Sequence, residues 1–208
     1  MVLENFVAFE GIDGAGTTTQ IDLLKARPDA GRFFLTAEPT DGPTGRFLRA
    51  MLGGDLTLDP RTAAYLFAAD RAEHLWGADG IAAQCARGNI AVSDRYLFSS
   101  LAYQSVTCGD ELPRALNAPF PLPELLFFFA IDPKTALERV HGRGKTELYE
   151  TLDFQTATAA RYERVIAEYE GTAQGAGMKV VRIDAAQSKE HVAKIISREL
   201  ANLPILKT

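Results

Sequence analysis

Short, continuous apolar runs alternate along this chain with longer segments whose apolar residues recur at helical spacing. The apolar runs lack the in-and-out alternation of a half-exposed strand, which is typical of strands buried on both faces of a parallel sheet. They predict strands at Val7–Phe9, Arg32–Leu35, Ile90–Ser93, Leu125–Ile131 and Lys179–Ile183.

The segments between these runs predict seven helices. A chain in which strands and helices alternate is expected to form an α/β fold with three layers, a five-stranded parallel sheet flanked by helices on both faces. In such folds, ligands bind beyond the carboxyl ends of the strands. The predicted helices are Thr18–Ala26, Thr44–Leu52, Pro60–Ala86, Ser99–Gln104, Lys134–Val140, Asp153–Glu170 and Lys189–Leu200.

A glycine-rich loop follows the first predicted strand. Gly11, Gly16 and Thr18 fit the P-loop pattern G-x-x-x-x-G-K-[ST], but Thr17 stands where the lysine belongs. Strand, loop and helix start coincide as the motif requires, so we expect a P-loop NTPase fold rather than an ordinary glycine-rich turn. Backbone N–H groups and the helix dipole would hold nucleotide phosphates, and the Thr18 hydroxyl would ligate Mg²⁺. The expected phosphate-binding residues are Gly11, Ile12, Asp13, Gly14, Ala15, Gly16, Thr17 and Thr18.

Other charged residues occur where a ligand could reach them. Asp94 and Arg95 end the third predicted strand, where a carboxylate can hold Mg²⁺ and a guanidinium can grip a phosphate. The alternative is a surface ion pair, and the strand-end position favours the functional interpretation.

Phe67 and Arg71 lie four positions apart on one face of a predicted helix. Together they could bind a base; the alternative is that Phe67 is a core residue and Arg71 a surface charge. Arg49 is equally open between a solvated charge and a phosphate ligand.

A segment rich in glycine and basic residues, at about residues 141–151, predicts a small lid. It contains Arg143 and Lys145, and Arg139 precedes it on a predicted helix. A lid can bring positive charge to a transferring phosphoryl group and exclude water. A solvated loop is the alternative.

Composition limits the classes of protein that remain. With 208 residues, 47% of them hydrophobic, we expect one domain spanning 1–208. A net charge of −5 argues against a nucleic-acid coat, and the longest apolar run is too short to span a bilayer. Cys85 and Cys108 have no metal-ligand spacing and are expected to be reduced thiols of a cytoplasmic protein.

Taken in order, these segments resemble the thymidylate kinase family over nearly the whole chain. The most specific are LFAADRAEH and AVSDRYLFSSLAYQ; the others are FVAFEGIDGAG, TAEPT, GRFLRAML and IDPKTALERVHGRG. The resemblance implies ATP-dependent phosphorylation of dTMP to dTDP, with Mg²⁺ as the metal. It also implies a homodimer, with dTMP and ATP as its small-molecule partners.

The resemblance also implies residue roles. Phe67 would stack on thymine, Arg71 would bond its edge, and Arg49 and Arg95 would hold the dTMP phosphate. The base and sugar pocket would be lined by Ser100, Tyr103 and Gln104, and Tyr103 would favour deoxyribose. Arg139 and Arg143 would be lid arginines at the ATP phosphates. The implied metal site comprises Asp13, Thr18 and Asp94, and the implied catalytic residues are Asp13, Asp94, Arg95 and Arg143.

The chain departs from the family pattern at two places. Thr17 replaces the P-loop lysine, and Ala37 and Thr40 replace an arginine and a glycine around Glu38-Pro39. Two alternatives therefore stay open: a nucleotide-binding protein with weak or no kinase activity, and a kinase of another deoxynucleotide such as dUMP.

Overall fold

All five predicted strands are present and form one parallel sheet. A computed structural model describes residues 1–141 and 148–207, so Arg143 and Lys145 of the predicted lid lie outside the described residues. The sheet order is β2-β3-β1-β4-β5. The strands are β1 (Val2–Gly11), β2 (Phe33–Ala37), β3 (Ile90–Asp94), β4 (Leu122–Ala130) and β5 (Lys179–Asp184).

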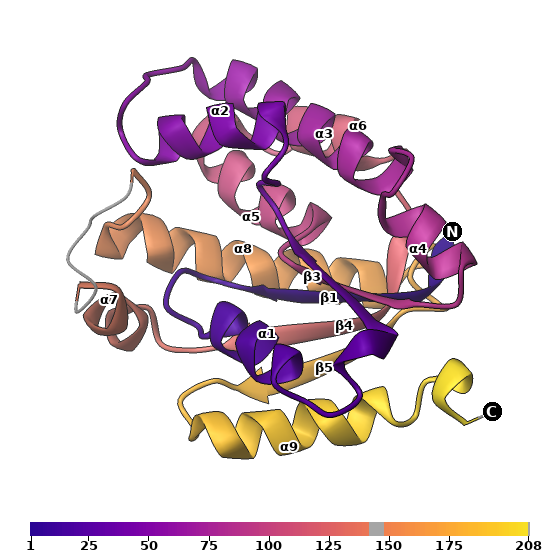
Figure 1. Ribbon diagram of the computed structural model, residues 1–208. Helices are drawn as coiled ribbons and strands as arrows, with labels where there is room; N and C mark the ends of the chain where they lie inside the picture. The colour runs from indigo at the N-terminus through magenta and orange to yellow at the C-terminus, as the bar shows by residue number, and fades with distance from the viewer. Residues whose placement is uncertain (142–147, 208) are drawn as a thin grey trace.

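Helices cover both faces of the sheet, which confirms the predicted three-layer α/β fold (Figure 1). The helices are α1 (Thr17–Lys25), α2 (Pro43–Leu52), α3 (Pro60–Trp76), α4 (Ile81–Ala86), α5 (Leu97–Cys108), α6 (Glu111–Asn117), α7 (Pro133–His141), α8 (Leu152–Glu170) and α9 (Lys189–Leu200). None of the helices among residues 1–141 and 148–207 has the length and apolar character that a membrane crossing demands.

The continuous apolar runs are explained by burial on both sides. Along β1, Phe6 and Ala8 pack into a core shared with α5 and α8, while Val7 and Phe9 pack into a second core shared with α1 and α9. All four side chains are completely buried. A strand with two apolar faces has no polar positions to alternate with, so its sequence shows no period of two.

Two helix predictions were wrong. The single predicted helix Pro60–Ala86 is two helices, α3 and α4, separated near Gly77 and Gly80, both of which have extended ψ angles. A Cβ at Gly80 would lie 2.6 Å from the His74 carbonyl oxygen, so only glycine lets the chain turn this tightly. Helix α6 was missed altogether, because it is short and contains Pro113, a residue that disfavours a helix interior.

Strand register brings the chemically important loops together. Phe9 of β1 pairs with Asp94 of β3, and Ala37 of β2 pairs with the same Asp94. The carboxyl ends of three adjacent strands therefore meet at one edge of the sheet. The loops that follow them build the site described next.

Candidate active site

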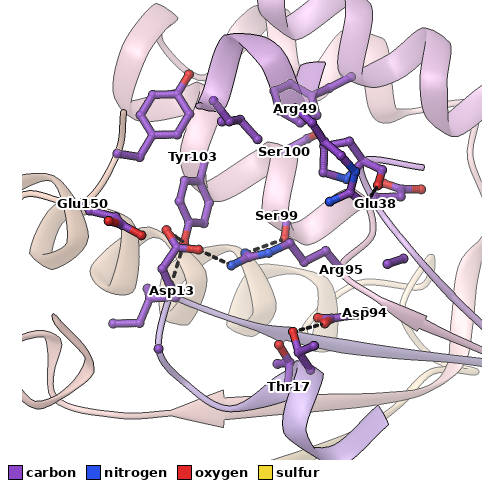
Figure 2. A pocket seen from close by; sticks show the side chains of 18 of the residues that line it. Asp13, Thr17, Glu38, Arg49, Asp94, Arg95, Ser99, Ser100, Tyr103 and Glu150 are labelled. Carbon is purple, nitrogen blue, oxygen red and sulfur yellow. Dashed lines mark hydrogen bonds and ion pairs between the residues drawn. The ribbon is translucent and has the colours of Figure 1, made fainter. Parts of the chain in front are cut away.

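A pocket of about 550 Å³ lies at this edge of the sheet (Figure 2). Its wall is formed by the glycine-rich loop, residues 37–39, and parts of α2, α3, α5 and the segment before α8. Its volume is in the range of small-molecule sites. Among the residues predicted from sequence it includes Ile12, Asp13, Gly14, Gly16, Thr17, Thr18, Arg49, Phe67, Arg71, Asp94, Arg95, Ser100, Tyr103 and Gln104.

Four predicted residues lie outside that lining or outside the described chain. Gly11 and Ala15 belong to the glycine-rich loop without lining the pocket. Arg139 is exposed on α7, beside the loop, and its Nη1 donates to the Ala185 carbonyl at 3.0 Å and to the Gly14 carbonyl at 3.5 Å. Arg143 falls outside the described residues.

The glycine-rich loop owes its shape to two left-handed glycines. Gly14 and Gly16 have φ angles of 83° and 94°. A Cβ at Gly14 would also come within 2.2 Å of the Ala136 carbonyl oxygen. Helix α1 begins at Thr17, directly after the loop, so the positive end of its dipole adjoins the loop. This is the arrangement that binds phosphate in P-loop proteins.

Asp94 and Thr18 form a pair of oxygen ligands beside this loop. The Thr18 hydroxyl donates to Asp94 Oδ2 at 2.6 Å. The other carboxylate oxygen, Oδ1, is buried and has no hydrogen-bond partner within the described chain. A buried carboxylate oxygen without a partner is costly unless something else, such as a cation or its water, satisfies it. The pair therefore fits Mg²⁺, which takes one or two carboxylates and completes its shell with water and phosphate.

Arg95 adopts a backbone conformation that its residue type usually avoids. Its φ is 72°, in the left-handed region, and this costs on the order of 1 kcal/mol. The backbone is held there by its own N–H bonding the Phe9 carbonyl (2.8 Å) and by the Ser93 hydroxyl bonding its carbonyl (2.6 Å). The strain turns the guanidinium toward the loop, where it pairs with Asp13 and donates to the Gly11 carbonyl at 3.0 Å.

Asp13, Arg95 and Tyr103 point toward one another in the pocket (Figure 2). The Tyr103 hydroxyl donates to Asp13 Oδ2 and accepts from the Asp13 backbone N–H, both at 3.0 Å. The Arg95 guanidinium lies 5.2 Å from the centre of the Tyr103 ring. Burial, assisted by the negative Asp13, raises the pKa of Tyr103 far above its ordinary value, so it remains a neutral hydrogen-bond donor.

Arg71 is completely enclosed, with 1% of its surface exposed. It anchors a network that sequence reasoning missed, because its partners lie far apart in the chain. Its Nε and Nη2 donate to Glu38 Oε2 at 3.0 and 2.6 Å. Its other acceptors are Asn117 Oδ1, the Tyr96 carbonyl and the Ser100 hydroxyl. His74 bonds the second Glu38 oxygen at 3.0 Å.

Glu10 is a second buried acid that sequence reasoning missed. It accepts hydrogen bonds from the Tyr96 and Ser99 backbone N–H groups, the Ser99 hydroxyl and the Tyr162 hydroxyl, at 2.6–3.2 Å. Burial raises its pKa to about 7 despite these donors. The carboxylate fixes the start of α5, and hence Arg95 just before it. An acid inside the apolar run of β1 was the signal available in the sequence.

Two of the residues predicted to bind the acceptor nucleotide lie in the pocket wall. Phe67 and Gln104 both line the pocket. Gln104 is buried, and its Oε1 has no partner among the described residues. Arg49 is half-exposed on α2, where it donates to the Pro39 carbonyl and lies 3.8 Å from Asp41. The structure thus brings the predicted aromatic, amide and guanidinium groups to one pocket.

A parallel sheet, a glycine-rich loop at the start of a helix and a buried Asp–Thr pair beside that loop define a P-loop nucleotide-binding protein. Comparisons with known proteins identify its family. The thymidylate kinase family model matches residues 9–196. The chain belongs to the thymidylate kinase family, as its sequence predicted.

Named relatives agree with the family model. The chain is 40% identical to a candidate thymidylate kinase from Treponema pallidum, across 99% of each chain. It is 39% identical to one from Aeropyrum pernix, across 87% of this chain and 86% of that one. A relative from Methanocaldococcus jannaschii, also named as a candidate thymidylate kinase, is 38% identical across 81% of this chain and 85% of its own.

Proposed function

We propose that this chain transfers the terminal phosphoryl group of ATP to dTMP, giving dTDP and ADP, in the cytoplasm. The observation that carries the proposal is a pocket whose lining combines the phosphate-binding loop with groups that could bind a base. Thr18 and Asp94 line it beside the loop, and Phe67, Arg71 and Gln104 line it from α3 and α5. Family membership and the names of the relatives support dTMP as the acceptor.

The reaction needs no side-chain nucleophile. A phosphate oxygen of dTMP attacks the γ-phosphorus of ATP, the bond to the β–γ bridging oxygen breaks, and ADP leaves with that electron pair. The protein contributes positioning and charge complementarity, which are the main sources of rate enhancement in phosphoryl transfer. Thr18 and Asp94 would hold Mg²⁺ through their oxygens. When bound, the metal neutralises charge on the donor phosphates.

The acceptor would bind between α2, α3 and α5. Phe67 offers a ring for stacking, and Gln104 offers a buried amide for the base edge. Arg71 has five N–H groups, of which one on Nη1 is not used by the network described above. That hydrogen is the donor we assign to the base. Arg49 and Arg95 would bind the acceptor phosphate.

We also propose a homodimer. Tyr65 and Trp76 of α3 are 57% and 55% exposed, and Phe47 of α2 is 43% exposed. Large apolar side chains at the surface of adjacent helices are typical of an interface. Sedimentation analysis of the wild type and a Tyr65→Arg variant tests this, since the variant should sediment as a monomer.

The kinase proposal is tested by ADP production from ATP and Mg²⁺ with dTMP, dUMP, dCMP or thymidine as acceptor. We expect dTMP to be the best acceptor and dUMP, lacking one methyl group, to be slower by about 10–200-fold. A wild type that binds nucleotides but produces no ADP would overturn the kinase proposal. It would favour the alternative of a binding protein, which the described structure and the comparisons do not support.

Two arginines of α2 supply a matched pair for that assay. Arg49 lines the pocket, whereas Arg46 is exposed one turn earlier, and among the described residues its side chain bonds only the Asp41 carbonyl. Arg49→Ala should raise the KM for dTMP by about 10–100-fold, because one charge-assisted hydrogen bond is lost. Arg46→Ala should leave it within about twofold. Equal effects of the two substitutions would contradict the placement of the acceptor phosphate.

A further inference from the structure

Gln155, in the first turn of α8, links two separate parts of the pocket wall. Its side chain is fully buried. Its Nε2 donates to Asp13 Oδ2 at 2.7 Å and to the Tyr149 carbonyl oxygen at 3.0 Å. Both partners can only accept, so the nitrogen must face them and the amide orientation is fixed. The acceptor Oε1 is left buried without a partner in the described structure.

The first link fixes which oxygen of Asp13 is open to a ligand. Oδ2 accepts from Tyr103 and Gln155, and Oδ1 accepts from Arg95. A carboxylate has about four lone-pair positions. Donors among residues 1–141 and 148–207 use three of them, and the fourth lies on Oδ1, the oxygen that also pairs with Arg95. Without Gln155, the carboxylate could rotate about its Cβ–Cγ bond and exchange the two oxygens.

The second link fixes the segment of residues 148–150, which forms one wall of the pocket. The Leu148 N–H bonds the Leu52 carbonyl at the end of α2, at 3.1 Å. The Tyr149 ring stacks on Phe154 with centroids 4.7 Å apart and planes at 12°. Tyr149 and Glu150 line the pocket, and Glu150 lies on the same side as Asp13 (Figure 2). Gln155 therefore joins this wall to the phosphate-binding loop.

We propose that Gln155 is a positioning residue for phosphoryl transfer. It holds Asp13 in the orientation that the acceptor nucleotide requires and couples that orientation to the position of residues 148–150. The proposal rests on the proposed kinase function. It extends that function, because the site residues expected from sequence include Asp13 but not the residue that orients it.

Three variants separate positioning from simple packing. Gln155→Met keeps the length of the side chain and removes both donors. Gln155→Glu keeps the shape and replaces the donor by an acid. Thr158→Val is the matched control, since Thr158 is equally buried one turn further along α8 and its hydroxyl bonds nothing in the described structure. Each variant is assayed for ADP production with dTMP, and its thermal unfolding is measured.

We expect Gln155→Met to lower kcat/KM for dTMP by about tenfold or more, with the KM for ATP changed by less than about twofold. Thr158→Val should match the wild type. A loss in Thr158→Val equal to that in Gln155→Met, or a Gln155→Met variant within twofold of wild type, would overturn the proposal while the kinase function stood.

Gln155→Glu supplies a readout that packing alone would not change. It keeps the packed shape more closely than Gln155→Met but sets a carboxylate against Asp13, so it should lower kcat/KM for dTMP at least as much as Gln155→Met does. A Gln155→Glu variant with clearly higher activity than Gln155→Met would follow packing alone and would overturn the proposal.

Amide hydrogen exchange tests the coupling without any turnover. In the nucleotide-free protein, the Leu148 N–H is protected by its bond to Leu52. Gln155→Met should speed exchange in peptide 148–154 by about tenfold, and Thr158→Val should not. If the wild type made no ADP, the kinase proposal would fall, and exchange would still decide whether Gln155 couples Asp13 to residues 148–150. Unchanged exchange in Gln155→Met would overturn that coupling.

Discussion

Replacing Arg71 by methionine should destabilise the protein strongly, because the buried Glu38 carboxylate would lose its ion-pair partner. Glu38 is 7% exposed, and Arg71 supplies two of its hydrogen bonds. After the substitution, only His74 would face the carboxylate from the side of α3. Breaking a buried ion pair by removing one partner costs about 3–5 kcal/mol.

Arg71→Met would also remove two cation–π contacts. The Arg71 guanidinium lies 5.3 Å from the Tyr96 ring centre and 5.7 Å from the Phe120 ring centre, and both contacts would disappear. Total stabilities of natural proteins are about 5–15 kcal/mol, so this one change removes a large share. At about 2–4 °C per kcal/mol for a chain of this length, the melting temperature should fall by roughly 6–20 °C.

Urea unfolding of wild type, Arg71→Met, Glu38→Gln and the double variant measures the effect and its cause. If the loss arises from the stranded carboxylate, the double variant should recover at least about 1.5 kcal/mol relative to Arg71→Met alone. Strictly additive losses, or an Arg71→Met variant less than about 1 kcal/mol below wild type, would refute the reasoning.

Three further predictions concern other buried or pocket residues. Thr17→Lys should raise kcat/KM for ATP by about tenfold or more through a charge-assisted phosphate contact; unchanged kinetics would mean that another cation already serves the donor phosphates. Burial raises the pKa of Glu10 to about 7 from an ordinary 4.5, so the folded protein keeps a proton that the unfolded chain loses. Stability should therefore fall as pH rises from 4.5 to 7, by on the order of 3 kcal/mol, and unfolding of Glu10→Gln should lack this slope. Burial raises the pKa of the Cys85 thiol to about 11. A thiol reagent at pH 8 should therefore label the half-buried Cys108 before the buried Cys85, as followed by mass spectrometry. Equal labelling rates of the two cysteines would contradict this.

The sheet was predictable because its signal is local. Buried parallel strands are short apolar runs, and the glycine-rich loop carries its own pattern between a strand and a helix. The break between α3 and α4 was harder to predict, since Gly77 and Gly80 interrupt a segment whose other residues favour helix. The turn depends on contacts of those glycines with carbonyl groups at the end of α3, which no periodicity reports.

The candidate site was predictable only for residues that follow strands or stand in recognisable segments. Asp94 and Arg95 were found in this way, and the structure places both in the pocket. Two contacts could not be found in this way because they join distant parts of the sequence. Glu38 and Arg71 are separated by 33 positions, and Asp13 and Gln155 are separated by 142 positions. Polar residues in helices are usually solvated, so nothing in the local sequence distinguishes Gln155 from a surface glutamine.

The charge balance of the pocket distinguishes Arg49 from the other two arginines that line it, Arg71 and Arg95. Arg71 is paired with Glu38, and Arg95 with Asp13, so each guanidinium is already balanced by a carboxylate. Arg49 has only the Pro39 carbonyl and an aspartate 3.8 Å away, and it is therefore the least neutralised arginine of the described pocket lining. Since Thr17 brings no charge to the loop, Arg49 should carry the larger part of the attraction for phosphate. Raising ionic strength should accordingly weaken dTMP binding in the wild type more than in Arg49→Ala.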